Sequence, residues 1–161
     1  MSSRWAFAFT TLIVPCLFPQ ISSAQDEASA KQFLEKIYSN YTKKALPNDL
    51  FGPSISLTFT PSLVELIQAD QKVLKGEVGF LGMDPICACQ DYDISSLQLH
   101  FEPEHENGLK ATATFDNLGH PTVVSLDLVP VGDQWRIDDI HSTGVDSLRR
   151  SLANEIESLK K

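Results

Sequence analysis

Positive charge is scarce in this chain of 161 residues, which carries 13 Lys and Arg against 21 Asp and Glu. The resulting net charge of −8 argues against nucleic acid or an anionic membrane surface as a partner, because both select basic patches. It leaves a basic protein partner open. No Lys or Arg stands between Lys75 and Lys110, whereas that stretch contains seven carboxylates.

Several catalytic signatures are also missing. The sequence has no phosphate-binding loop, no dinucleotide fingerprint and no Gly-x-Ser-x-Gly motif. A Ser-x-x-Lys match begins only at Ser158, at the chain end and without partners for a triad. Internal repeats and low-complexity segments are absent too. We therefore expect neither a cofactor nor a resident metal.

A long apolar run occurs only at the start of the chain. Arg4 is followed by an uncharged stretch from Trp5 to Phe18, and Ser22-Ser23-Ala24 then supplies the small residues that a signal peptidase requires. The run is too short for a bilayer span, which needs about 20 residues. We predict a signal peptide at residues 1–24 and a single domain at 25–161. The mature protein would be periplasmic or secreted by a bacterium, without a stable membrane span.

Helical periodicity appears in three places. Residues 27–44 carry an apolar stripe at helical spacing, and Pro47 is expected to end that helix. A second helix is predicted from Thr60-Pro61, a cap followed by proline, to about Lys75. Residues 146–160 predict a terminal helix. The stripe of the first helix comprises Ala30, Phe33, Leu34, Ile37, Tyr38 and Tyr41.

After residue 93 the apolar period changes to two, which predicts β-strands. Turn residues at 106–108, 117–119 and 132–133 divide this part into four strands joined by hairpins. Helices followed by a β-meander predict an α+β domain, in which N-terminal helices cover one face of a curved antiparallel sheet. The remaining concavity is where we expect a small apolar ligand.

Four segments carry a resemblance to known families. The strand QWRIDDI (134–140) looks like the last strand of nuclear-transport-factor-2-like domains, which are cones of helices against a bent sheet. The segments IYSNY (37–41), LVELIQADQKVLKGEVG (63–79) and DPICACQDYDI (84–94) together resemble the exported bacterial domain-of-unknown-function family 3828. The resemblance covers roughly residues 27–150 and implies the cone-like fold. It implies no reaction and no catalytic residues, and the terminal helix departs from the simplest cone.

The segment 84–93, DPICACQDYD, is the most unusual part of the chain. Export to an oxidising compartment favours a disulfide between Cys87 and Cys89, the two cysteines left after signal removal. Buried free thiols, redox exchange and zinc stay open, although zinc sites normally space their cysteines further apart. An EF-hand-like calcium loop is a further alternative, with oxygen ligands at Asp91, Asp93, Ser95 and Glu102.

The candidate loop or pocket-rim residues are Asp84, Asp91, Asp93, Tyr38 and Tyr41. Asp side chains cap turns well, so we expect these residues to shape the loop. A pocket carboxylate could also act as a general base if its pKa were raised and a tyrosine polarised the substrate. The sequence therefore predicts an exported binding or interaction domain. The alternative is an isomerase or hydratase that uses a pocket carboxylate.

Overall fold

The computed structural model describes residues 23–42, 52–104 and 107–160. It confirms an α+β fold in which helices precede a four-stranded antiparallel sheet and one helix follows it. No helix in these ranges is long and apolar enough to cross a membrane. The elements in order are α1 (Ser23–Tyr38), α2 (Ile55–Thr58), α3 (Pro61–Leu74), η1 (Phe80–Gly82), β1 (Ile94–Pro103), β2 (Leu109–Asn117), β3 (His120–Val131), β4 (Gln134–Ser142) and α4 (Leu148–Leu159).

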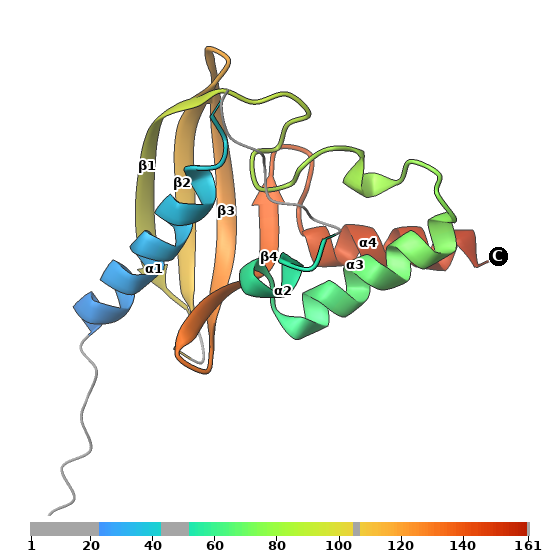
Figure 1. The fold of residues 1–161 in the computed structure, drawn as a ribbon, viewed down its shortest axis with the longest axis horizontal. Coiled ribbons are helices and arrows are strands. Elements are labelled where there is room, and N and C mark those ends of the chain that lie inside the picture. Colours follow the sequence, from blue (N-terminus) through green and yellow to red (C-terminus); the bar gives the residue numbers. More distant parts are fainter. Residues whose placement is uncertain (1–22, 43–51, 105–106, 161) are drawn as a thin grey trace, which may run out of the picture.

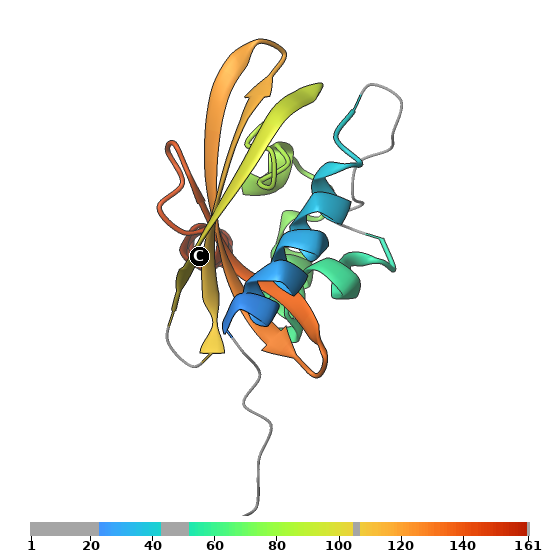
Figure 2. The same ribbon diagram turned by 90° about the vertical axis from the view of Figure 1, so that its left-hand side faces the viewer.

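The sheet is a meander in the order β1-β2-β3-β4, and its strands are long and curved (Figure 1). Helix α1 lies across one face of this sheet, as the view from the side shows (Figure 2). Helices α3 and α4 pack against each other beyond β4 (Figure 1). The molecule therefore has two regions, a sheet covered by α1 and a helix pair at the β4 edge.

Alternation along the strands places the core as the sequence predicts. Ala111, Ala113 and Phe115 of β2 are buried, whereas Thr112 and Thr114 between them are not. A β-bulge changes this alternation in β4, because Asp127 pairs with Asp139 while Leu128 pairs with Ile137. One extra residue at the bulge shifts the pleat. As a result Trp135, Ile137 and Ile140 all face the core.

Helix α1 is shorter at its C-terminus than the predicted 27–44. It ends at Tyr38, and Tyr41 then lies in the following segment, where its carbonyl accepts a hydrogen bond of 2.9 Å from the Ile94 backbone N–H. This contact draws the chain out of the helix toward β1. The predicted stripe is otherwise confirmed, since Ala30, Leu34, Ile37, Tyr38 and Tyr41 are buried. Pro47, the predicted stop, lies outside the described residues.

The space between α1 and the sheet is occupied by aromatic side chains. The ring centroid of Tyr38 lies 5.4 Å from that of Phe115 and 5.9 Å from that of Tyr41. Tyr41 in turn meets Tyr92 at 5.6 Å in an edge-on arrangement, a geometry that aromatic pairs favour. Side chains thus fill this part of the concave face, where we expected a ligand.

A polar cluster fixes α3 and α4 to β4. Thr60 caps α3 by accepting from the Leu63 N–H at 3.3 Å, and its hydroxyl donates to Asp138 Oδ1 at 2.8 Å. Arg149, at the start of α4, pairs with the Asp138 carboxylate and donates to Ser62 Oγ at 2.7 Å. Because Asp138 is carried by the bulge, the bulge sets where the helix pair begins.

Candidate functional site

The structure joins Cys87 and Cys89 by a disulfide, with Cα atoms 5.1 Å apart, so these sulfurs are not available as zinc thiolates. Ala88 between them has a φ of +50°, which non-glycine residues seldom adopt. This residue supplies the bend that a bridge across one residue requires. The backbone groups of Asp84 and Cys89 close the same turn through hydrogen bonds of 2.8 and 3.2 Å.

Three of the predicted rim residues meet at this turn. Asp84 accepts hydrogen bonds from the Tyr41 hydroxyl at 2.6 Å and from the Ile86 N–H at 2.8 Å. The Tyr38 hydroxyl donates to the Ile86 carbonyl at 3.0 Å. Burial raises the pKa of Asp84, although these hydrogen bonds oppose the rise. Burial, together with the nearby Asp84 charge, also raises the pKa of Tyr38. The contacts anchor the loop to the end of α1.

Asp91 and Asp93 lie further along and are held through their backbone. The Asn117 side chain accepts from the Asp93 N–H at 2.9 Å and donates to the Asp91 carbonyl at 3.0 Å. Asn117 is a contact that the sequence did not reveal. The calcium-loop alternative is wrong, because Ile94–Pro103 forms strand β1. An extended strand rises about 3.3 Å per residue, so Glu102 is carried far from Asp91.

A second cluster joins β3 to β4. His141 Nε2 lies 2.8 Å from Asp127 Oδ2, and ligand atoms of Asp127, Asp139 and His141 all fall within 4.8 Å of one another. Burial lowers the pKa of His141, but the Asp127 hydrogen bond and its negative surroundings raise it overall. Lys110 lies 3.4 Å from Asp127, and Ser147 donates to Asp139 at 2.5 Å. The buried Asp127 Oδ1 has no hydrogen bond from a described residue and is balanced only by the Lys110 ion pair; with these contacts the cluster forms a polar crosslink between β3 and β4.

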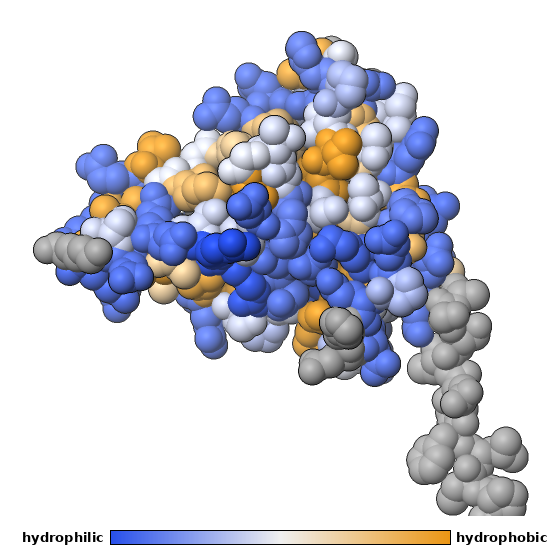
Figure 3. Space-filling view, turned by 180° about the vertical axis from the view of Figure 1, so that it is seen from behind, coloured by the Kyte–Doolittle hydropathy of each residue, from blue (hydrophilic) through white to orange (hydrophobic). Residues whose placement is uncertain are grey.

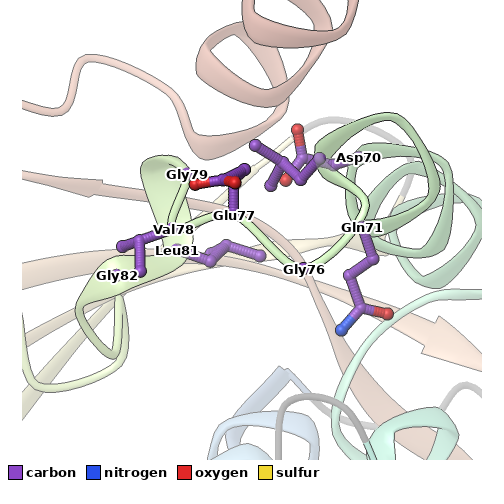
Figure 4. Close-up of a pocket in the computed structure, with 9 residues that line it drawn as sticks. Asp70, Gln71, Gly76, Glu77, Val78, Gly79, Leu81 and Gly82 are labelled. Atoms are coloured by element: carbon purple, nitrogen blue, oxygen red, sulfur yellow. The ribbon is translucent and has the colours of Figure 1, made fainter.

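The third feature is a pocket of about 290 Å³ between α3 and the segment 76–82, which contains η1 and is called here the 76–82 loop. Figure 4 shows Asp70 and Gln71 on the α3 side, with Val78, Leu81 and Gly82 on the loop side. Its size is at the lower end of ligand pockets. The lining residues are Asp70, Gln71, Leu74, Gly76, Glu77, Val78, Gly79, Leu81 and Gly82.

Asp70 is the unusual group of this pocket, because its side chain is ionisable and yet 0% exposed. Within the described residues its oxygens meet no donor except the carboxyl of Glu155 on α4. Burial raises the pKa of Asp70 to about 6, and the charge of Glu155 and a hydrogen bond to it act in the same direction. The Asp70 carboxyl is therefore half protonated near pH 6 and mostly ionised at pH 7.5.

The 76–82 loop is fitted closely against this pair. The Phe80 N–H donates to Glu155 Oε2 at 2.7 Å. A Cβ at Gly79 would lie 2.4 Å from the Leu74 side chain and 2.9 Å from Glu155 Oε2, so a larger residue would require both of these side chains to move. Gly76, at a φ of +95°, gives the backbone turn that follows α3. The glycines thus place the loop over the carboxyl pair.

Sequence reasoning missed Asp70 and Glu155, although a signal was present. Asp70 falls on the buried stripe of α3, three residues after Ile67 and seven after Leu63. Glu155 falls at the matching position of α4, three residues after Leu152. A carboxylate on the apolar stripe of each of two helices is a sign of a paired buried site. The sequence does not indicate that these two side chains meet, because it does not specify which helices pack together.

Comparison with known proteins supports the fold and leaves the family open. No family model matches the chain, so the resemblance to family 3828 is not confirmed. "Uncharacterized protein YqhG" of Escherichia coli (strain K12) is 28% identical over 120 residues. The match covers 71% of this chain but only 39% of the E. coli protein.

A solved structure shares the fold. A chain from the crystal structure of the type VI native effector-immunity complex Tae3-Tai3 of Ralstonia pickettii aligns with a TM-score of 0.52 and 20% sequence identity. The alignment covers 73% of this chain and 94% of that chain. At this identity the likeness shows a common architecture, a cone-like sheet with helices, and a function does not follow from it.

Proposed function

We propose that this chain is an exported protein-binding domain of the bacterial envelope, and that the 76–82 loop contacts its partner. The observation that carries the proposal is Val78, whose side chain is 87% exposed on this loop. Leu81 lines the pocket beside it, and Met83, just after the loop, is 37% exposed. Exposed apolar side chains grouped beside a pocket are a feature of protein contact surfaces.

Other features of the protein also support a binding role. The face of the molecule seen in Figure 3 is largely hydrophilic, with small separate hydrophobic areas, as expected for a surface that remains in water. The structural neighbour comes from an effector-immunity complex, which is an assembly of proteins. A predicted signal peptide and net charge of −8 fit an envelope protein that meets a basic partner.

The enzyme alternative has weaker support. Asp84 and Tyr41, a candidate base and its donor, are bonded to each other at 2.6 Å. Asp70 has the pKa of a general base, about 6, but catalysis also needs a group that polarises the substrate. Among the residues that line the pocket, Gln71 is the one side chain able to donate a hydrogen bond. A binding role requires no such group.

Site-specific photo-crosslinking in living cells tests the proposal. A photoreactive phenylalanine analogue replaces Val78 in the full chain, and the same analogue at Val123, 52% exposed on β3, serves as the control. We expect one adduct of defined mass at position 78 and none at 123. Identical products at both positions, or none at either, would show that the 76–82 loop is not a contact surface.

A further inference from the structure

We propose that the pocket beneath the 76–82 loop receives a lysine or arginine side chain of the partner protein. The cationic head would pair with Asp70, and the alkyl stem would lie against Leu74 and Leu81. This inference rests on the proposed function, which it deepens by naming the chemistry of the partner. It adds a ligand site at residues outside the 84–93 segment.

The charge around the pocket favours a cation. Asp70 and Glu77 line it, and Glu155 meets Asp70 from α4. No Lys, Arg or His is among the lining residues, and the ion pairs between described residues involve none of these three acids. Lys72 and Lys75 line a different depression, shared with the C-terminal end of α4. The negative charge of the pocket is therefore not balanced by a basic side chain.

The state of Asp70 supports the same conclusion. A fully buried carboxyl normally has hydrogen-bond donors around it, yet here Glu155 is its one described neighbour of that kind. At pH 7.5, above its pKa of about 6, Asp70 is mostly ionised and is repelled by the charge of Glu155. A cation that reaches Asp70 would offset this repulsion. Both Asp70 oxygens are closed to solvent in this structure, so the 76–82 loop has to shift for a cation to reach them.

The shape of the pocket sets the size of that group. About 290 Å³ lies below most small-molecule sites, so a single side chain suits it better. Leu74, Val78 and Leu81 form apolar walls that match the methylene stem of a long basic residue. The acidic group lies at the buried α3 side and Glu77 is exposed. Apolar walls above an acidic floor match the methylene stem and the charged end of a basic side chain.

The exposed Val78 favours a protein over a free amine. A small polyamine could pair with Asp70 but would leave Val78 in water. A protein surface that inserts a basic residue also covers this apolar side chain, which is the arrangement of a buried anchor surrounded by contacts that exclude water. We therefore assign the cation to a partner protein.

Two short peptides test the assignment against the mature full-length domain at pH 7.5. One is acetyl-Val-Gly-Lys-Gly-Val-amide, and the other has norleucine, an uncharged analogue, in place of lysine. Two-dimensional NMR follows the backbone amides of Gly76, Gly79 and Gly82. We expect the lysine peptide to shift these amides in a saturable way, with at least tenfold weaker binding to Asp70→Asn. The variant Asp133→Asn, which removes an exposed charge in the β3–β4 turn, should bind as the parent does.

Three results would overturn the assignment. These are equal shifts with the norleucine peptide, unchanged affinity in Asp70→Asn, and spermidine binding at least a hundredfold more tightly than the lysine peptide. The last result would identify a free polyamine as the ligand. If the Val78 crosslink forms while the peptide fails, only the basic-side-chain assignment is lost. If the peptide binds but no crosslink forms, the proposed protein partner is lost.

Discussion

Replacing Asp70 by asparagine should make the protein more stable at neutral pH. The substitution keeps the size of the side chain and removes the charge. The asparagine N–H can still donate to the Glu155 carboxyl, as the protonated Asp70 does. The buried position of Asp70 and its shortage of donors mean that ionisation is harder in the folded protein than in the unfolded chain.

The size of the effect follows from the pKa of Asp70. One pKa unit corresponds to about 1.4 kcal/mol, and the value rises from 3.8 to about 6 on folding. Asp70 therefore lowers the free energy of unfolding by up to about 3 kcal/mol once it is ionised. Below pH 3.8 it is protonated in both states and has no such effect. Between these two pH values the unfolded chain loses the proton first, so stability falls as the pH rises.

Urea unfolding at pH 4, 5, 6 and 7.5 measures this difference. Trp135 is buried in β4, and the other tryptophan lies in the predicted signal peptide, so intrinsic fluorescence reports on the core. We expect Asp70→Asn and the parent to be close at pH 4. The variant should gain between about 1 and 3 kcal/mol by pH 7.5, whereas the control Asp133→Asn should differ little at any pH.

A stability difference that does not change with pH would refute this reasoning. So would an Asp70→Asn protein that is less stable than the parent at pH 7.5, because Asp70 would then have a stabilising partner. If the variant is more stable yet loses the lysine peptide, stability and binding are in opposition at this residue. That outcome is expected of a functional site.

Two further predictions concern the 84–93 segment. Asp84→Ala leaves the Tyr41 hydroxyl and the Ile86 N–H without their acceptor, and should lower the free energy of unfolding by about 2–4 kcal/mol. The matched change Asp91→Ala, at an exposed side chain, should cost under about 0.5 kcal/mol; equal losses would contradict the anchoring role of Asp84. Replacing Cys87 and Cys89 together by alanine should lower the free energy of unfolding by only about 1.5 kcal/mol. The effect is small because the disulfide joins residues two positions apart and closes a very short loop. A loss above about 4 kcal/mol, measured by the same urea titration, would show that the bridge holds more than its own turn.

Much of the architecture follows from local sequence patterns. The apolar stripe from Ala30 to Tyr41 and the cap at Thr60 predicted two helices, and the alternation around Phe115 predicted strands, because side-chain direction repeats every 3.6 residues in a helix and every two in a strand. The pairing of Cys87 with Cys89 was also the favoured alternative from the sequence, for a different reason. The predicted signal peptide left these cysteines no other partner.

The site was decided by tertiary structure. Asp70 and Glu155 are far apart in sequence, and they meet because Arg149, Thr60 and the Asp138 bulge set α3 beside α4. The space under α1 was likewise filled by rings from distant segments, Tyr38 and Phe115. Local patterns determine which face of an element is buried, since that depends on neighbouring residues alone. Which two buried faces come together depends on how the whole chain packs, and the residues of one apolar stripe do not specify the stripe that packs against it.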